Sequence, residues 1–244
     1  MRFAAIADIH GNCDALAAVL ADIASLGIDD VVNLGDHLSG PLAPIQTAEM
    51  LMARDFPSVR GDQDRHMIDR HRAGDLSRGD VRALRQEQVA WLAAQPATLL
   101  YRDEVFLCHA APDDDAAFWL EGITEGDTPR PSNLASIEAR AAGIDASLIL
   151  CGHSHIPRIV RLGDGRLIVN PGSVGLPGYR ISTPKRYHVQ TGTPDACYAI
   201  AERRDGCWSL TFRYVPYDGT AMAALARRGG RPDWATAIAT GWVE

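Results

Sequence analysis

The most constraining feature of this sequence is a series of short apolar runs that each end in Asp, His or Asn. Stretches with apolar residues at helical spacing separate the first of these runs. This alternation predicts a layered α/β fold with mixed sheets, in which the loops at the carboxyl ends of the strands converge. The polar residues that follow the runs are therefore expected to meet at one edge, and they are Asp8, His10, Asn12, Asp36, Asp62, His109, His153, His155 and Asn170.

Hydrophobic periodicity and turn residues predict the elements along the chain. We expect strands over 2–7, 30–34, 58–60, 98–101, 104–108 and 147–151, and helices over 14–27, 45–54, 80–96 and 133–143. Two hairpins are expected over 158–170 and 197–215, followed by two short helices within 220–240. Residues 56–66 are interpreted as a strand end that runs into a short polar loop, and residues 177–195 as a long irregular surface loop.

Each polar residue has an ordinary structural explanation when it is considered alone. Asp8 could belong to a polar turn, Asn12 could cap the following helix, and His109 could be a satisfied, partly buried histidine. The joint pattern favours a different explanation, because several strands would have to place Asp or His at their ends independently. The mixture of carboxylate oxygens and imidazole nitrogens is typical of a two-metal hydrolytic centre.

Six motifs carry a resemblance to a known family: DIHGN (8–12), GD (35–36), RGDQDR (60–65), CHAAP (108–112), GHSHIP (152–157) and NPGSVGLP (170–177). The motifs occur in the same order as in the calcineurin-like metallophosphoesterases. The sequence therefore resembles that family, and most closely its small bacterial phosphodiesterase branch. The resemblance implies an α/β fold, a four-layer sandwich of two mixed β-sheets flanked by helices. It also implies that residues 1–244 form one domain.

The resemblance assigns a role to each candidate residue. It implies that Asp8, His10, Asp36 and His155 hold a first metal ion, and that Asp36 bridges to a second ion held by Asp62, His109 and His153. A hydroxide shared between the ions would be the nucleophile, and Asn12 would help to hold the phosphate or the hydroxide. Carboxylate and imidazole ligands fit divalent transition metals, so we expect two such ions, with Mn²⁺ first and Fe, Zn, Ni or Co as alternatives.

The RGDQDR motif departs from the family, whose usual sequence is Gly-Asn-His followed by Asp or Glu. Asp62 stands where the family has a metal-binding Asn, and Gln63 stands where it has the His that protonates the leaving group. An amide cannot donate a proton as an acid, and neither His37 nor His66 has a spacing that supports it as a replacement. We therefore expect substrates whose leaving groups have a low pKa, such as aryl esters or phosphoanhydrides.

Charge and composition limit the kinds of molecule that this protein is expected to bind. The net charge is −7, and the sequence has no run of basic residues of the kind that binds nucleic acid. Because the protein is negatively charged overall, a phosphate ester would bind only if the metal ions make the site itself positive. No apolar stretch reaches the roughly 20 residues that a membrane helix needs, and the N-terminus does not read as a signal peptide. The five dispersed cysteines do not suggest disulfides; Cys108 and Cys151 are expected to be buried thiols. A cytoplasmic protein with a small phosphorylated substrate is expected, and a homo-oligomer is compatible with the sequence.

We interpret the chain as a metal-dependent phosphoesterase, most simply a phosphodiesterase. Two alternatives remain open: a dinucleoside polyphosphate hydrolase that cleaves a phosphoanhydride, and a catalytically weakened protein that binds metal or nucleotide on the same fold. The loss of a His at position 63 favours the second alternative. An unrelated α/β domain with chance polar loops is the least compatible with the joint pattern.

Overall fold

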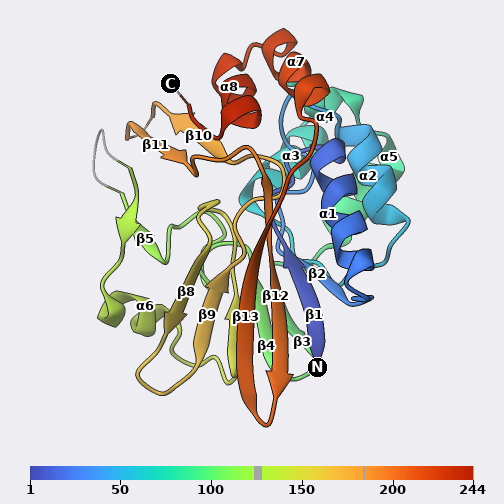
Figure 1. The fold of residues 1–244 in the computed structure, drawn as a ribbon. Helices are drawn as coiled ribbons and strands as arrows, with labels where there is room; N and C mark the ends of the chain where they lie inside the picture. The colour runs from blue at the N-terminus through green and yellow to red at the C-terminus, as the bar shows by residue number, and fades with distance from the viewer. Residues whose placement is uncertain (124–127, 184, 244) are drawn as a thin grey trace.

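The computed structural model describes residues 1–123, 128–183 and 185–243, and its centre is a pair of β-sheets packed face to face (Figure 1). In spatial order, the first sheet consists of β13 (Cys207–Val215), β12 (Ala196–Arg204), β1 (Arg2–Ile6) and β2 (Val31–Asn33). The second consists of β3 (Thr98–Tyr101), β4 (Val105–Cys108), β7 (Leu148–Leu150), β9 (Leu167–Asn170) and β8 (Arg158–Arg161). Both sheets are mixed, since β1 is parallel to β2 but antiparallel to β12, and β7 and β9 are parallel whereas β8 is antiparallel.

The side chains of β1 point alternately to the two faces of its sheet, and both faces are covered by other layers. Successive strand residues face opposite sides of a sheet, so Phe3 and Ala5 point between the sheets while Ala4 and Ile6 point outward. All four are completely buried, which is why the run RFAAI carries no polar residue after Arg2. The cluster between the sheets is completed by apolar side chains from both of them, including Val32, Leu34, Val105, Leu107, Leu148, Leu150 and Val169.

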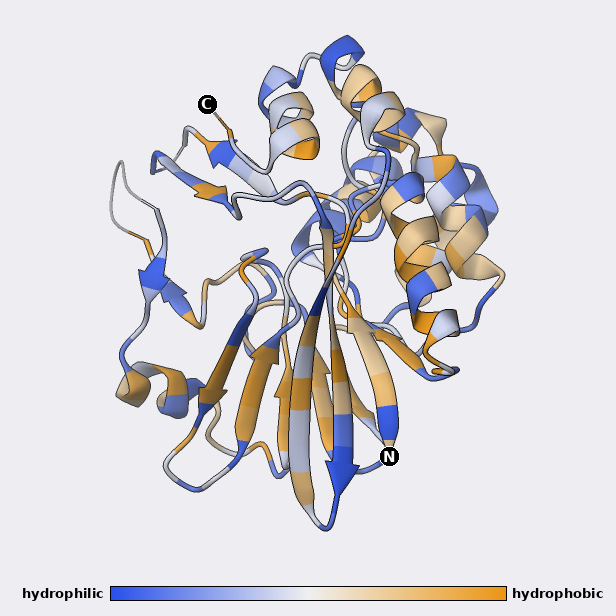
Figure 2. Cartoon of the chain, viewed as in Figure 1, coloured by the Kyte–Doolittle hydropathy of each residue, from blue (hydrophilic) through white to orange (hydrophobic). Residues whose placement is uncertain are grey.

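Helices cover the outer faces of both sheets and complete the predicted four-layer sandwich. Helix α1 (Cys13–Ser25) packs Leu16 and Val19 against Ile6 and Tyr198 of the first sheet. On the opposite side, α6 (Leu134–Arg140) places Ile137 in a cluster with residues of β7 and β9. Figure 2 shows that the strands of the two sheets are mainly hydrophobic, whereas the helices carry both hydrophobic and hydrophilic residues.

The remaining elements gather around the end of the sheets at which β1 finishes (Figure 1). Four helices follow β2 in the chain: α2 (Pro44–Met52), α3 (Asp62–Arg72), α4 (Gly79–Ala83) and α5 (Gln86–Ala94). Two small ribbons are formed by β5 (Glu121–Gly122) with β6 (Arg130–Pro131), and by β10 (Gly178–Ile181) with β11 (Tyr187–Gln190). The last two helices are α7 (Thr220–Arg228) and α8 (Pro232–Thr240).

Several local predictions are confirmed. The hairpins β8–β9 and β12–β13 occur where the Gly-containing turns predict them, and α7 and α8 form the expected pair of short helices. Cys108 and Cys151 are buried, and all five cysteines are free thiols. Within the described residues, no helix combines the length and the apolar character that crossing a membrane requires.

Four local predictions are wrong. The expected helix over 80–96 is two helices, because Leu84 and Arg85 are extended and the Gln88 side chain accepts from the Arg85 N–H at 3.0 Å. Residues 58–60 make a single bridge to Asn33 instead of a strand. The polar segment after Gly61 is not a loop but the first turn of α3. Apart from residue 184, which lies outside the described residues, segment 177–195 is not irregular but contains the hairpin β10–β11.

Candidate metal centre

The loops after the strands bring the predicted Asp and His residues together. Among the described residues, three groups can be formed in which one ligand atom from each residue lies within 4.8 Å of the others: Asp8, His10 and His155; Asp62, His109 and His153; and Asp8, Asp36 and His109. The groups share members, so they make one continuous cluster. Asp62 enters it from the N-terminus of α3, and the other six residues come from loops that follow β1, β2, β4 and β7.

A left-handed backbone conformation is common to five of these seven residues. The φ angles are 54° at Asp8, 51° at His10, 55° at Asp36, 68° at His153 and 61° at His155. Non-glycine residues adopt this region rarely, at a cost on the order of 1–3 kcal/mol each when it is sparsely populated, and such residues cluster at functional sites. Backbone hydrogen bonds between the loops hold them there, including Asp8 N to Gly35 O at 3.0 Å and His10 N to Asp36 O at 2.9 Å.

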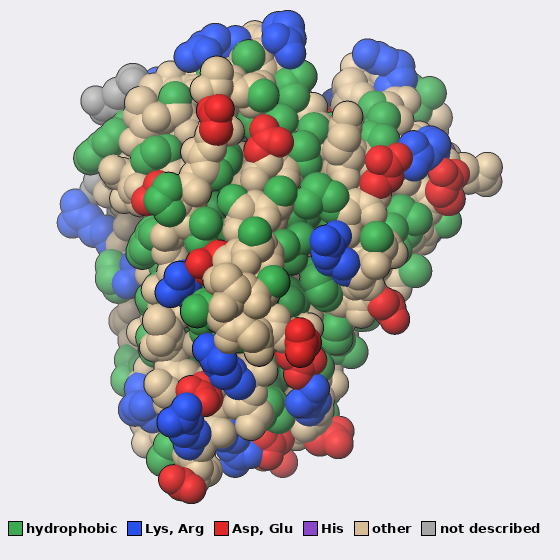
Figure 3. Space-filling view, turned by 45° about the vertical axis from the view of Figure 1, so that its right-hand side comes forward, with side chains coloured by type: hydrophobic (Ala, Val, Ile, Leu, Met, Phe, Trp, Pro, Cys, Tyr) green, Lys and Arg blue, Asp and Glu red, His purple; other side chains and the backbone are tan. Residues whose placement is uncertain are grey.

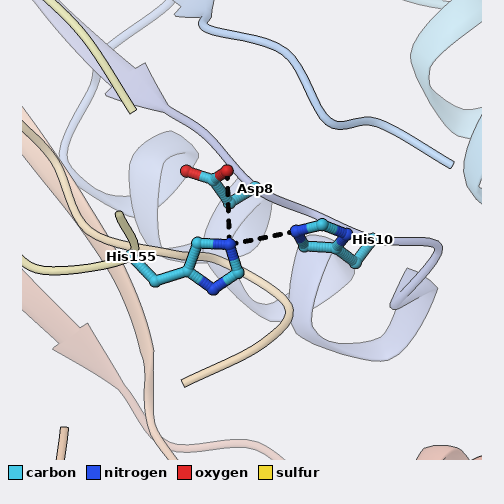
Figure 4. A group of neighbouring side chains, drawn as sticks. All are labelled: Asp8, His10 and His155. Carbon is cyan, nitrogen blue, oxygen red and sulfur yellow. Dashed lines mark hydrogen bonds and ion pairs between the residues drawn. The ribbon is translucent and has the colours of Figure 1, made fainter. Parts of the chain in front are cut away.

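In the first group, the side chains of His10 and Asp8 both face the ring of His155 (Figure 4), and neighbouring residues orient the two rings. The Nδ1 of His155 donates to the Leu176 carbonyl at 2.7 Å, and the Nδ1 of His10 bonds to the Ser39 hydroxyl at 2.9 Å. Such bonds leave Nε2 as the atom free to bind a metal. The two Nε2 atoms lie 3.1 Å apart, and the Nε2 of His155 lies 3.4 Å from Oδ1 of Asp8.

In the second group, His109 follows the same rule, whereas His153 turns its Nδ1 toward Asp62. The Nδ1 of His109 donates to the Leu34 carbonyl at 2.7 Å, and its Nε2 lies 3.4 Å from Oδ1 of Asp62. The Nδ1 of His153 lies 3.3 Å from that same oxygen. The rings of His109 and His153 have centroids 5.3 Å apart, which is close enough for both to reach one ion.

Asp36 lies between the two groups with one oxygen toward each. Its Oδ2 is 3.6 Å from Nε2 of His10, and its Oδ1 is 3.5 Å from Nε2 of His109. A carboxylate with one oxygen toward each group is oriented to bridge two ions. Gly61 is required for this arrangement, because a Cβ at position 61 would lie 2.0 Å from Oδ1 of Asp36.

The donor set fits divalent transition metals. Four buried side-chain atoms of the cluster have no hydrogen-bond partner among the described residues: Oδ1 of Asp8, Oδ1 of Asp62, Nε2 of His109 and Nε2 of His153. Buried polar atoms without a partner are rare and costly in proteins. Bound cations would satisfy the lone pairs of the two carboxylate oxygens and of Nε2 of His109, and the mixture of imidazoles and carboxylates is the one that such metals prefer.

Burial and mutual charge set the protonation states of the cluster. Burial, followed by the neighbouring His155, lowers the pKa of His10 to about 3, so its imidazole is neutral and available as a ligand. Burial also opposes a charge on His109, but Asp36 and the other carboxylates outweigh it and raise the pKa of His109 well above its usual value. Burial and nearby carboxylates, Asp62 first among them, raise the pKa of Asp36. The site therefore attracts positive charge.

A supporting carboxylate, Asp64, was missed by the sequence interpretation. It is completely buried and accepts from the N–H groups of Asp36, His37 and Gly61 at 2.8, 3.0 and 2.9 Å. Its Oδ2 also lies 2.6 Å from the Nδ1 of His37. The position two residues after Asp62, in the first turn of α3, was the available signal, because a carboxylate there can accept from preceding N–H groups.

Two residues predicted to be catalytic, Asn12 and Gln63, make different kinds of contact. The Asn12 side chain is completely buried and caps α1 by accepting from Ala15 N at 3.1 Å, while its amide donates to Gly175 O and to the Tyr217 hydroxyl. The polar atoms of Asn12 are therefore bonded within the scaffold, and its role on the phosphate or the hydroxide stays a prediction. Gln63 does face the site, and its amide donates to Oδ2 of Asp62 at 2.7 Å.

Neither histidine near the altered motif is placed as an obvious substitute acid. His37 is completely buried and bonded to Asp64. His66 lies on α3 at the border of the site, with its Nδ1 4.0 Å from Oδ2 of Asp62. A pocket of about 1260 Å³ opens over the cluster and is bordered by His10, Asp36, Asp62, His153 and His155.

Comparisons with known proteins agree with this geometry. The model of the calcineurin-like phosphoesterase superfamily domain matches residues 1–192. An uncharacterized protein from Methanocaldococcus jannaschii is 24% identical over 255 residues, covering 95% of this chain and 94% of its own. The crystal structure of a metallophosphoesterase from Sphaerobacter thermophilus superposes with a TM-score of 0.73 at 26% identity, over 99% of this chain and 100% of its own. A hypothetical protein from Pyrococcus horikoshii gives the same TM-score at 18% identity, over 100% and 99% of the two chains.

Proposed function

The chain belongs to the calcineurin-like phosphoesterase superfamily, and on that premise we propose that it is a phosphodiesterase that uses two divalent transition-metal ions, with Mn²⁺ the first candidate. Asp8, His10 and His155 would hold one ion; Asp62, His109 and His153 would hold the other. The single observation that carries the proposal is the position of Asp36, whose two oxygens face the two groups.

Bound ions would polarise the phosphoryl oxygens and lower the pKa of a water molecule enough for it to act as a nucleophile near neutral pH. The residues of this chain orient that chemistry. Hydrogen bonds to Nδ1 of His10, His109 and His155 fix the ring directions. The N–H of Gln63 donates to Oδ1 of Asp36 at 3.1 Å and restrains the bridging carboxylate.

The leaving group is the point at which this chain differs from its family. The Gln63 amide can donate a hydrogen bond but cannot supply a proton. Substrates that depart as stable anions therefore suit this site best. Aryl-type diesters meet that condition, and phosphoanhydrides such as dinucleoside polyphosphates are the second candidate, favoured by the same observation.

We propose a small phosphorylated molecule as the substrate and a cytoplasmic location. Figure 3 supports the first point, because on the face it shows Lys and Arg side chains are interspersed with Asp and Glu and do not gather into a basic patch. A stable homo-oligomer remains compatible with this proposal.

Metal analysis together with a turnover assay tests the function. We expect two metal ions per chain after Mn²⁺ loading, and hydrolysis of bis-p-nitrophenyl phosphate that disappears after chelation. Asp36→Asn should reduce both the metal content and the activity, whereas Asp69→Asn, at an exposed position of α3, should reduce neither. Metal binding without turnover would support a sensor instead, and the absence of bound metal would refute the site.

A further inference from the structure

We propose that the pocket over the metal centre holds a planar aromatic ring of the substrate's organic part, such as a nucleobase, and that Tyr187 and Phe118 contact this ring. The inference rests on the proposed function, because it takes the metal centre as the place where the phosphate binds. It adds the substrate class: phosphate esters that carry an aromatic ring.

Several parts of the chain border this pocket. The hairpin β10–β11 contributes Tyr179, Ile181 and Tyr187, and α8 with the segment before it contributes Arg231 and Trp234. Other lining residues come from α3, α4 and the segment between them, from segment 39–44, and from segment 116–123, which includes Phe118. The volume of about 1260 Å³ exceeds the roughly 300–1,000 Å³ of typical small-molecule sites. A substrate much larger than a phosphate group therefore fits beside the cluster.

An arc of aromatic rings connects the two groups of candidate ligands. Tyr179 packs edge-on to His155, with ring centroids 4.7 Å apart, and Tyr187 follows at 6.2 Å from Tyr179. Phe118 lies 5.7 Å from Tyr187 and 5.0 Å from His153. Because the arc begins at a residue of the first group and ends at one of the second, a ring that packs against it keeps an attached phosphate close to both groups.

Of the aromatic residues in this arc, Phe118 and Tyr187 are exposed enough to contact a substrate. Tyr179 is 8% exposed and serves mainly to support His155, whereas Phe118 and Tyr187 are only partly buried and border the pocket. Their rings are perpendicular, at an interplanar angle of 90°. This arrangement offers an incoming ring both a face and an edge, which are the preferred geometries of aromatic contacts.

Among the residues that the structure describes, Lys185 is a cation of the pocket that could contact the substrate. Arg78 is paired with Asp80, and Arg231 makes two hydrogen bonds to Asp233, at 2.9 and 2.7 Å. Lys185 borders the pocket and has no ion pair within 1–123, 128–183 and 185–243. The pocket therefore presents an uncharged aromatic surface and a lysine, which suits an uncharged ring linked to an anionic phosphate.

Calorimetric titration of the Mn²⁺-loaded protein with AMP and with ribose 5-phosphate tests the inference. The two ligands share the sugar phosphate and differ by the base, and phosphate release is measured in parallel. We expect AMP to bind at least about tenfold more tightly, the effect of stacking one base on an aromatic side chain. Equal dissociation constants, or no binding of either ligand, would overturn the inference.

Substitutions at the two aromatic residues test whether they cause the preference for AMP over ribose 5-phosphate. Tyr187→Leu and Phe118→Leu should each reduce the preference for AMP to about threefold or less. Tyr214→Leu is the matched control, since this tyrosine is 46% exposed on β13 and does not border the pocket, and it should keep the wild-type preference. A preference that survives both pocket variants would refute the assigned contact. Loss of diester turnover with an intact AMP preference would refute only the proposed hydrolysis.

Discussion

Asp64→Asn is expected to weaken both the fold and the metal centre, although Asp64 is not a candidate ligand. One oxygen of Asp64 accepts from Asp36 N, Gly61 N and the His37 ring, and the other accepts from His37 N. An asparagine that keeps the first oxygen in place must turn its NH₂ group toward the N–H of His37. It also removes the negative charge that strengthens the remaining bonds.

The magnitude follows from these contacts. A hydrogen bond to a charged group contributes about 1.5–3 kcal/mol, and a buried donor left without a partner costs about 1–3 kcal/mol. One lost bond and three weakened ones therefore predict a decrease of roughly 2–4 kcal/mol in the free energy of unfolding. Because Asp64 anchors the backbone of Asp36, metal affinity should fall by about 10- to 100-fold, as is typical when an outer partner of a ligand is lost.

Urea unfolding of the metal-free protein measures the first effect, and titration with Mn²⁺ measures the second. Asp69→Asn makes the same chemical change at an exposed position of the same helix and should leave both values near wild type. Equal values for the two variants would show that the bonds of Asp64 do not hold Asp36 in place. A loss of stability with unchanged metal affinity would refute the positioning role alone.

Three further predictions concern other parts of the molecule. Gly40→Ala should lower the melting temperature and alter tryptophan fluorescence, because its Cβ would lie 2.3 Å from the Trp234 ring. Gln63→His should increase turnover of an alkyl diester more than that of a nitrophenyl diester, and equal increases would show that position 63 does not face the leaving group. The hydrogen bond from Arg213 lowers the pKa of Asp22, so its stabilisation is present above the ordinary Asp pKa and is lost as the pH falls through the folded-state pKa. Urea unfolding should therefore find Asp22→Asn less stable than wild type at pH 7, with a difference that closes on acidification.

The convergence of the candidate ligands could be predicted from the sequence because it depends on topology. Residues that follow parallel strands are brought to the same edge whatever the details of packing. Asp8, Asp36, His109, His153 and His155 all obey that rule. The four-layer arrangement was predictable for a related reason, since fully apolar strands such as RFAAI must be covered on both faces.

The errors occur where long-range contacts decide a local conformation. Helix α3 begins with five polar residues, and its buried apolar pair, Met67 and Ile68, comes only near its middle. Its first turn is stabilised by Asp64, whose partners lie in a loop 27 and 28 residues earlier in the chain. In the same way, Tyr179 and Val189 of the hairpin β10–β11 are buried in a cluster with Trp234. No local pattern reveals such partners.

The pairing of β1 with β12 has a consequence for synthesis of the protein. Ala5 pairs with Ala199, so β1 waits for a partner strand that is translated 194 residues later. At about 5–20 residues per second this delay is roughly 10–40 s. During that time β1, which is apolar from Phe3 to Ile6, has only β2 beside it in its sheet. A nascent chain halted before residue 196 should therefore recruit holdase chaperones, and release should follow once β12 has emerged.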